Sequence, residues 1–126
     1  MIRVQPMNNE IKAQYSKAVE FKNNGQLEAA RDLLLDGMKK DPTSTAILAV
    51  LGDVYYEMGL WNEAVSVFKR AVENRPTLEA VSLGLFHSLW KLERYADALE
   101  EAKRFQASSY SEDYEEIFKE VNEKWK

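Results

Sequence analysis

The stretch LGDVYYEMGLWNEAVSVFKRAVENRP, residues Leu51–Pro76, decides the fold of this chain. Its small residues stand at set places between aromatic and aliphatic residues: Gly52, Gly59, Ala64 and Ala71. Small side chains allow two helix backbones to approach closely, because nothing bulky holds them apart. We therefore expect Gly52 and Ala64 to lie where two antiparallel helices meet, with the larger residues filling the remaining space.

Two helical patterns separated by a turn make up this region. Apolar residues recur at helical spacing across Ser44–Glu57 and again across Trp61–Glu73. Gly59 lies between the two patterns, and glycine readily takes the left-handed conformation that ends a helix. Pro76 ends the second pattern, because a proline disfavours helical geometry in the residue before it. The region therefore predicts a helix–turn–helix unit.

The same unit recurs with a period of 34 residues. This interval separates Gly25 from Gly59 and Pro42 from Pro76. Further sets at the same interval are Ala30, Ala64 and Ala98; Leu27, Trp61 and Tyr95; Phe21, Tyr55 and Leu89; and Leu34, Phe68 and Ala102. Self-similarity at a fixed period of roughly 20–50 residues is the signature of a repeat architecture.

This pattern resembles that of the tetratricopeptide repeat (TPR) family. In the middle repeat the family's motif is matched by Leu48, Leu51, Gly52, Tyr55, Gly59, Trp61, Ala64, Phe68, Ala71 and Pro76. The other two repeats depart from the motif: Lys17 replaces a leucine in the first, and the third has Phe86 and Glu93 at glycine positions. Repeats at the ends of an array are commonly atypical.

The resemblance implies an all-α fold, a TPR-type right-handed superhelix (α-solenoid) of three helix–turn–helix repeats with a C-terminal capping helix. In this single domain the repeats cover about residues 11–44, 45–78 and 79–112, and the last helix covers 111–126. We expect residues 1–7 to form a flexible N-terminus.

The last helix has an amphipathic pattern. Ser111 is its expected N-cap, with acidic residues in the first turn. The apolar stripe consists of Tyr114, Ile117, Phe118, Val121 and Trp125. Two alternatives are open for it. The stripe covers the apolar face of the last repeat, or it stays exposed as a continuation of the groove or as the surface of a homodimer.

In TPR proteins the first helix of each pair lines a concave groove that usually holds an extended or helical peptide. By this resemblance the partner-binding positions are Lys12, Tyr15, Val19, Lys22, Ala49, Asp53, Tyr56, Glu57, Leu83, His87, Trp90 and Lys91. Aromatic residues such as Tyr56 and Trp90 are favoured as binding anchors. The alternative for these two residues is that they cover a neighbouring helix.

One TPR subfamily binds the carboxylate-ended tails of heat-shock chaperones with a clamp of lysine, asparagine and arginine. The corresponding positions here hold Tyr15, Val19, Asp53, Ala80 and Gly84, so this ligand is not expected. Asp53 and Glu57 lie one helical turn apart and would suit a lysine or arginine of a partner. The alternative is that the two acids form an ordinary solvated face.

Composition argues against several classes of function. A net charge of -4 disfavours nucleic-acid binding, and no apolar run approaches the roughly 18 residues that span a bilayer. The chain has no cysteine and only one histidine, His87, and it lacks a glycine-rich phosphate loop. We therefore expect no metal, no cofactor and no enzymatic activity. The N-terminus has no apolar core of a secretory signal, which favours a cytoplasmic location.

These patterns together favour a non-enzymatic protein–protein interaction module, an adaptor or scaffold that binds a peptide segment or a partner protein in its concave groove. Two alternatives remain. One is a self-associating structural subunit. The other is an inhibitor or immunity-type chaperone whose acidic surface covers a basic partner.

Overall fold

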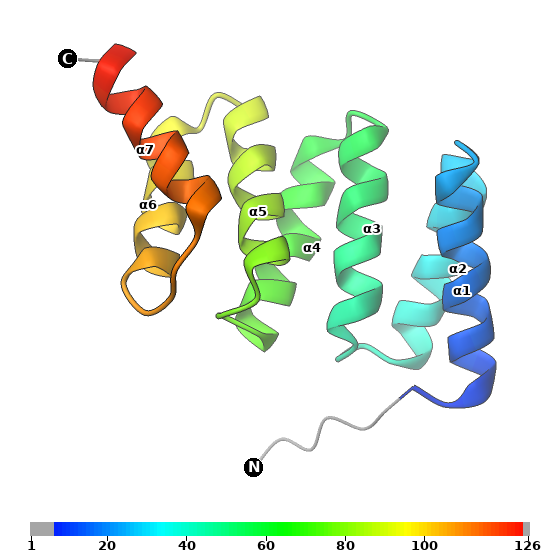
Figure 1. Ribbon diagram of the computed structural model, residues 1–126. Helices are drawn as coiled ribbons and strands as arrows, with labels where there is room; N and C mark the ends of the chain where they lie inside the picture. The colour runs from blue at the N-terminus through cyan, green and yellow to red at the C-terminus, as the bar shows by residue number, and fades with distance from the viewer. Residues whose placement is uncertain (1–6, 125–126) are drawn as a thin grey trace.

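The structure, a computed structural model, describes residues 7–124, and within them the chain forms seven α-helices (Figure 1). The helices are α1 (Asn9–Asn23), α2 (Leu27–Lys40), α3 (Thr45–Glu57), α4 (Trp61–Asn74), α5 (Glu79–Lys91), α6 (Tyr95–Gln106) and α7 (Glu112–Lys124). The expected flexible N-terminus lies outside the described residues except for Met7, which packs against the core. Trp125 of the apolar stripe also lies outside them.

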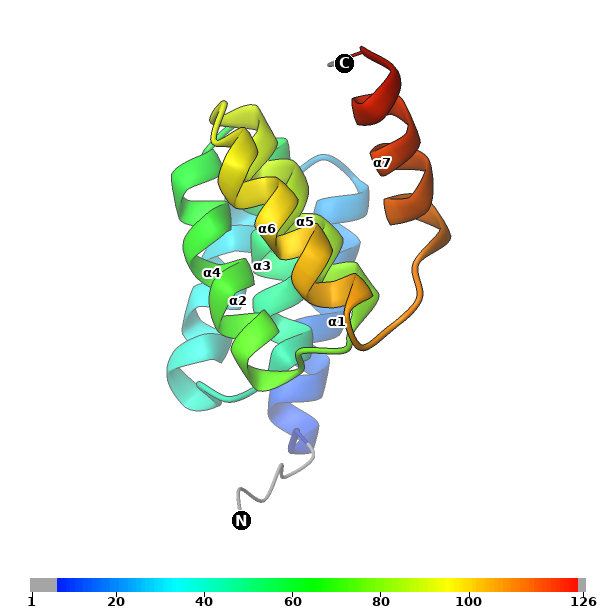
Figure 2. The ribbon, with the colours of Figure 1, turned by 90° about the vertical axis from the view of Figure 1, so that its left-hand side faces the viewer.

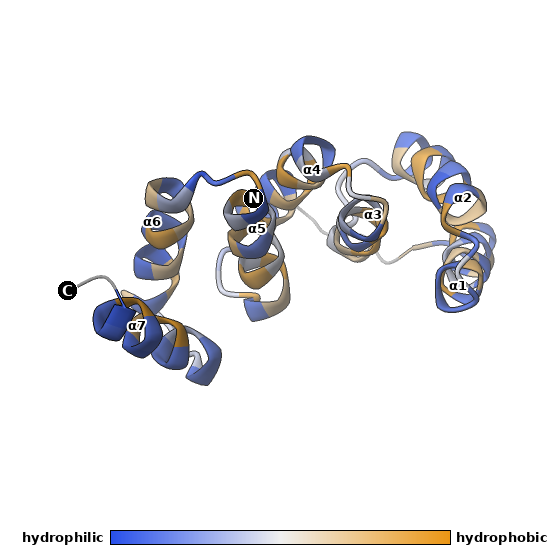
Figure 3. Ribbon diagram, turned by 90° about the horizontal axis from the view of Figure 1, so that it is seen from above, coloured by the Kyte–Doolittle hydropathy of each residue, from blue (hydrophilic) through white to orange (hydrophobic). Residues whose placement is uncertain are grey.

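The helices are arranged as consecutive antiparallel pairs, α1 with α2, α3 with α4 and α5 with α6, followed by α7. Seen from above, α1, α3, α5 and α7 follow an arc, and α2, α4 and α6 lie on its outer side (Figure 3). The expected all-α solenoid is thus confirmed. The first helices of the pairs form the inner, concave side of the array.

The three tight turns share one backbone conformation. Gly25 and Gly59 have φ angles of 79° and 77°, in the left-handed region that glycine enters without steric cost. In the third turn Glu93 has a φ of 59°, although it carries a side chain. Glu93 therefore keeps the geometry of the turn at some cost in strain, because the packing of α5 against α6 requires it.

The reason for Gly52 differs from the one expected. A Cβ atom on Gly52 of α3 would lie 2.6 Å from Cζ of Phe68, and one on Gly84 of α5 would overlap the same ring. The aromatic ring of Phe68 on α4 thus lies between two glycines of neighbouring helices and is almost completely buried. The glycines make room for a side chain rather than for close contact of two backbones.

Corresponding positions in the other repeats exchange large and small residues. Positions 52 and 68 correspond to Phe86 and Ala102 in the third repeat and to Ala18 and Leu34 in the first, and all four residues are buried. In every repeat one member of the pair is small and the other is large. The summed volume of the two side chains therefore stays similar from repeat to repeat. Phe86 can occupy a position that usually holds glycine because its counterpart, Ala102, is small.

Polar side chains join α1 to α2 in the first repeat. Nζ of Lys40 forms ion pairs with Asp36 at 3.0 Å and with Glu10 at 3.1 Å. The side-chain amide of Gln14 donates to the backbone carbonyl of Leu33 and to Asp36, both at 2.8 Å. Hydrogen bonds from Gln14 and Lys40 lower the pKa of Asp36.

The first turn of α7 docks on α5 and α6 through one buried aromatic residue. Tyr114 is completely buried, and its ring contacts those of Phe86 and Phe105 at centroid distances of 5.6 and 5.7 Å. Ser111 is the N-cap, as expected, because its Oγ accepts a hydrogen bond from the backbone N–H of Tyr114 at 3.2 Å. Beyond this turn α7 is inclined to α5 and α6 (Figure 2), and Ile117, Phe118 and Val121 are only half-buried.

A buried chain of polar groups fixes the same contact. Oγ of Ser82 donates to the Glu101 carboxylate at 2.7 Å, so the Tyr114 hydroxyl, also at 2.7 Å, donates to Ser82. Arg104 closes the chain with two hydrogen bonds to Glu101, at 2.7 and 2.8 Å. Burial raises the pKa of Tyr114, so its hydroxyl keeps the proton that it donates. Each of these buried polar side chains, Ser82, Glu101 and Tyr114, therefore has a hydrogen-bond partner.

Candidate functional site

A hollow of about 410 Å³ opens on the concave side between α3 and α5. It is lined by Asp53, Tyr56, Phe68, Ala80, Leu83, Gly84 and His87. The two residues of α3 are three positions apart, and the four of α5 follow helical spacing, so each helix presents one face to the hollow. Phe68 reaches the hollow from α4, in the layer behind.

The floor of this hollow is apolar. The ring of Phe68 lies directly against Gly84, and Leu83 flanks the glycine. The ring fills the space that a side chain at Gly84 would occupy, so the glycine and the edge of the ring together form the floor. The hollow therefore offers an aliphatic or aromatic side chain a place to be removed from water.

Asp53 is the carboxylate of the hollow. Its nearest cation, Lys22 of α1, forms an ion pair with Glu57 at 3.3 Å instead. Asp53 has no hydrogen bond or ion pair with any residue in the described range 7–124. Partial burial raises the pKa of this carboxyl, and the charge of Lys22 offsets the effect only in part. Asp53 is therefore a negative charge without a direct partner beside an apolar floor.

His87 forms the wall between this hollow and the next. Its ring meets that of Phe86 edge to face, with 5.3 Å between the centroids. Burial lowers the pKa of His87, the charge of Asp113 opposes that shift and the charge of Lys91 adds to it. The imidazole is therefore mainly neutral at pH 7, since its ordinary pKa is already near 6.5.

A second, smaller hollow of about 200 Å³ lies between α5 and α7. Its lining residues are Phe86, His87, Trp90, Ile117, Glu120 and Val121. Because His87 lines both hollows, they are neighbours along the concave side. The half-buried stripe of α7 thus forms one wall of this second hollow.

The α3–α5 hollow brings together four of the twelve predicted positions: Asp53, Tyr56, Leu83 and His87. Trp90 lies in the second hollow and packs within its own repeat, stacked on Phe86 at 5.5 Å and edge to face with Tyr95 at 4.5 Å. Lys91 points its Nζ over the ring of Trp61, 5.7 Å from the centroid.

The remaining predicted positions lie toward α1. Lys22 and Glu57 pair with each other, Tyr15 and Ala49 pack partly against the core, Val19 is half-buried and Lys12 is exposed. The sequence pattern placed Phe68 in the core and did not reveal it as the floor of the hollow. Gly84, a glycine inside a helical pattern, was the available signal for close contact at this point.

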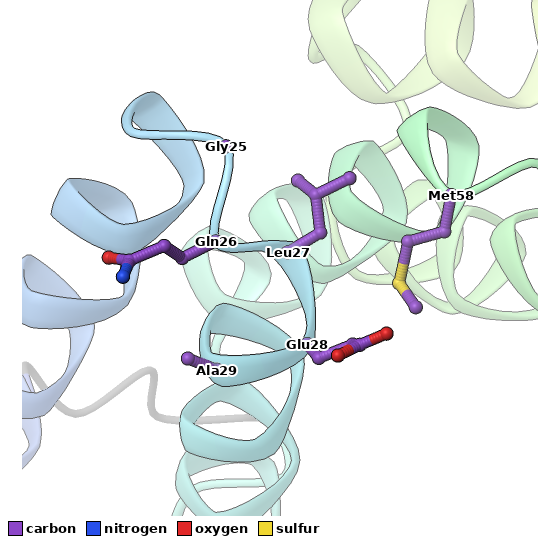
Figure 4. Close-up of a pocket in the computed structure, with 6 residues that line it drawn as sticks. All are labelled: Gly25, Gln26, Leu27, Glu28, Ala29 and Met58. Atoms are coloured by element: carbon purple, nitrogen blue, oxygen red, sulfur yellow. The ribbon is translucent and has the colours of Figure 1, made fainter.

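A larger hollow, of about 540 Å³, lies at the turn between α1 and α2, next to Met58. Figure 4 shows Leu27 and Met58 on either side of it, whereas Gln26 points away. Its walls are mainly a turn of backbone and small or flexible side chains. No aromatic side chain lines it, so we place the candidate site in the concave groove instead.

Residues 7–124 contain no cluster of metal-ligating side chains and no helix suited to span a membrane. No three histidine, aspartate or glutamate side chains lie close enough to one another to hold a metal ion. None of the helices combines the length and apolar character that crossing a membrane requires.

The chain is similar to known repeat proteins over most of its length. A family model described as the N-terminal TPR repeats region of Psidin matches residues 5–115. No curated protein sequence matches the chain. Among solved structures, the first TPR of Spaghetti (RPAP3) bound to the HSP90 peptide SRMEEVD is 13% identical, with a TM-score of 0.81 over 96% of this chain and 97% of that one.

Structures of MamA are also similar. A mutant form of MamA is 20% identical, with a TM-score of 0.74 over 82% of this chain and 76% of that one. The MamA chain from residue 41 to its end, from Desulfovibrio magneticus RS-1, is 21% identical, with a TM-score of 0.74 over 82% of this chain. The match covers 58% of that MamA chain, so this chain spans little more than half of it. At these identities the likeness concerns the fold.

Proposed function

Because the chain belongs to the TPR family, in the group described as the Psidin N-terminal TPR repeats region, we propose that it is a non-enzymatic protein–protein interaction module. Its ligand is a peptide segment of a partner protein, which binds in the concave groove at the α3–α5 hollow. The single observation that carries the proposal is this hollow, with an apolar floor and, at its wall, a carboxylate that pairs with no residue in the range 7–124.

The residue types support binding of a side chain from outside. An open apolar floor next to polar groups that can orient a ligand is the usual composition of a recognition site. Tyr56 and His87 add amphipathic rings to the walls, and such rings contribute contact area with little loss of conformational entropy. Leu83 supplies aliphatic surface between them.

One of the similar structures is bound to an HSP90 peptide, SRMEEVD, which is acidic. The groove of this chain is suited to a different ligand. The basic clamp positions hold Tyr15, Val19, Asp53, Ala80 and Gly84, and an acidic peptide in the hollow would meet the charge of Asp53. We therefore propose that the partner is not a carboxylate-ended chaperone tail.

We assign α7 the role of a covering helix rather than a dimer surface. Its buried Tyr114 and the polar chain through Ser82 and Glu101 hold it against the last repeat. Its half-buried residues then extend the groove as the wall of the second hollow.

The test is selection of random peptides displayed on phage against the full-length chain. Ala80→Trp places a large ring in the hollow, and Ala96→Trp makes the same change at an exposed position of α6. Peptides selected on the parent chain are expected to bind Ala96→Trp normally and to lose at least about tenfold in affinity for Ala80→Trp. Equal binding to both variants, with unchanged circular dichroism, would refute the groove as the binding site.

A further inference from the structure

We infer that the occupant of the α3–α5 hollow is a cationic segment, in which a lysine or arginine side chain reaches Asp53 while its aliphatic stem or an adjacent apolar side chain lies on the floor formed by Phe68, Leu83 and Gly84. This inference rests on the proposed function and specifies the chemistry of its ligand.

The ion pairs of the groove leave one carboxylate without a contact partner among residues 7–124. Lys22 of α1 and Glu57 of α3 satisfy each other at 3.3 Å. Asp53, one helical turn before Glu57, is left without a direct partner in the described structure. The groove therefore presents one negative charge that no cation among residues 7–124 neutralises by contact.

The carboxylate of Asp53 lies beside an apolar floor. Asp53 lines the same hollow as Leu83 and Gly84, and the ring of Phe68 fills the space behind the glycine. Lysine and arginine combine a charged head with an apolar stem, so one side chain can contact both surfaces. A small neutral side chain would leave the carboxylate unpaired, and an acidic one would be repelled.

The α7 side of the groove carries further negative charge. The negative charge of Asp113 is near enough to His87 to raise the pKa of the imidazole, and Glu120 lines the second hollow. The nearby cation, Lys91, is directed over the ring of Trp61. A segment that continues from the first hollow into the second thus meets further acidic groups, which favours additional basic residues in the same ligand.

The experiment uses the peptides selected by phage display on the full-length chain. The enriched sequences are expected to contain a lysine or arginine next to an apolar residue. Replacing the arginine by citrulline, which keeps the shape and removes the charge, should weaken binding about tenfold. Asp53→Asn should weaken binding of the arginine peptide by a similar factor and should not weaken the citrulline peptide further, because the two changes remove one interaction.

Glu73→Gln is the matched control, because it removes one negative charge from an exposed position of α4 outside the groove. It should leave all affinities within about twofold. Titration calorimetry of the two peptides against the three proteins measures the whole cycle.

The outcomes separate this inference from the proposed function. Enriched peptides without a cation, or with an acidic residue in its place, overturn the inference while the Ala80→Trp result still supports the groove. Equal binding of arginine and citrulline peptides overturns it as well. If Ala80→Trp has no effect, the proposed function itself fails. A concentration-dependent dimer in sedimentation that Ala80→Trp dissociates would assign the groove to a second copy of this chain and overturn the cationic segment.

Discussion

The ring of Phe68 on α4 occupies the space in which Gly84 on α5 would carry its side chain. The same ring fills the space beside Gly52 on α3, so one aromatic residue joins three helices of two repeats. Its edge is also the floor of the concave hollow. Core packing and the candidate binding site therefore share one residue, and a change at either glycine affects both.

Gly84→Ala should destabilise the chain by about 1–3 kcal/mol, because the added methyl group overlaps a buried ring that cannot easily move. Urea denaturation followed by circular dichroism measures the effect. Gly37→Ala is the control: a Cβ there would meet its nearest neighbour, Ile47, at 3.4 Å, an ordinary contact. Gly37→Ala should be neutral or slightly stabilising, since alanine favours a helix over glycine. Equal effects of the two substitutions would contradict this account.

The hydrogen bonds that join Tyr114, Ser82 and Glu101 under α7 predict which of two substitutions costs more stability. Ser82→Ala leaves both the Tyr114 hydroxyl and the Glu101 carboxylate short of a buried partner and should cost about 1–3 kcal/mol. Tyr114→Phe removes one hydroxyl and leaves the bond from Ser82 to Glu101, so it should cost about 0.5–1.5 kcal/mol. Thermal unfolding of both variants shows which substitution lowers stability more. A larger loss for Tyr114→Phe would show that the chain of hydrogen bonds is wrongly assigned.

Removal of α7 tests whether it covers the last repeat or forms a dimer. A chain ending at Tyr110 lacks Tyr114 and exposes Phe86 and Phe105, which the tyrosine contacts. We expect the truncated chain to melt at a lower temperature or to aggregate, and the full-length chain to be a monomer in light scattering. A full-length dimer that becomes a stable monomer on truncation would support self-association through α7 instead.

Asp53 predicts a dependence of stability on pH. Burial raises its pKa in the folded state above the unfolded value of 3.8, so the folded chain binds this proton more tightly. The ionised carboxylate therefore lowers stability as the pH rises through the folded pKa. Asp53→Asn should melt at the same temperature as the parent or higher at pH 7, and the difference should shrink as the pH approaches 3.8. Glu73→Gln controls for the loss of one negative charge. A lower melting temperature of Asp53→Asn at pH 7 would contradict a carboxylate without a partner.

The 34-residue period determined the helix pairs and the left-handed turns, because such features depend on residues close together in the chain. A glycine at positions 25 and 59 and apolar residues at helical spacing are local signals, whereas Glu93 takes the same turn geometry without a glycine. The repeat register also predicted which helices line the groove. It could do so because every repeat presents the same face to the concave side.

Tertiary structure decided which of these positions meet. Lys22 of α1 pairs with Glu57 of α3, 35 positions later in the chain, and Asp53 is left without a contact partner among residues 7–124. The ring of Phe68 reaches the groove only because Gly84 comes from the next repeat, at a position whose counterparts in the other repeats are Ser16 and Val50. Such contacts depend on the shapes of particular side chains across helices. A periodic pattern records the average character of a position, and it does not record the departures from that pattern that shape this site.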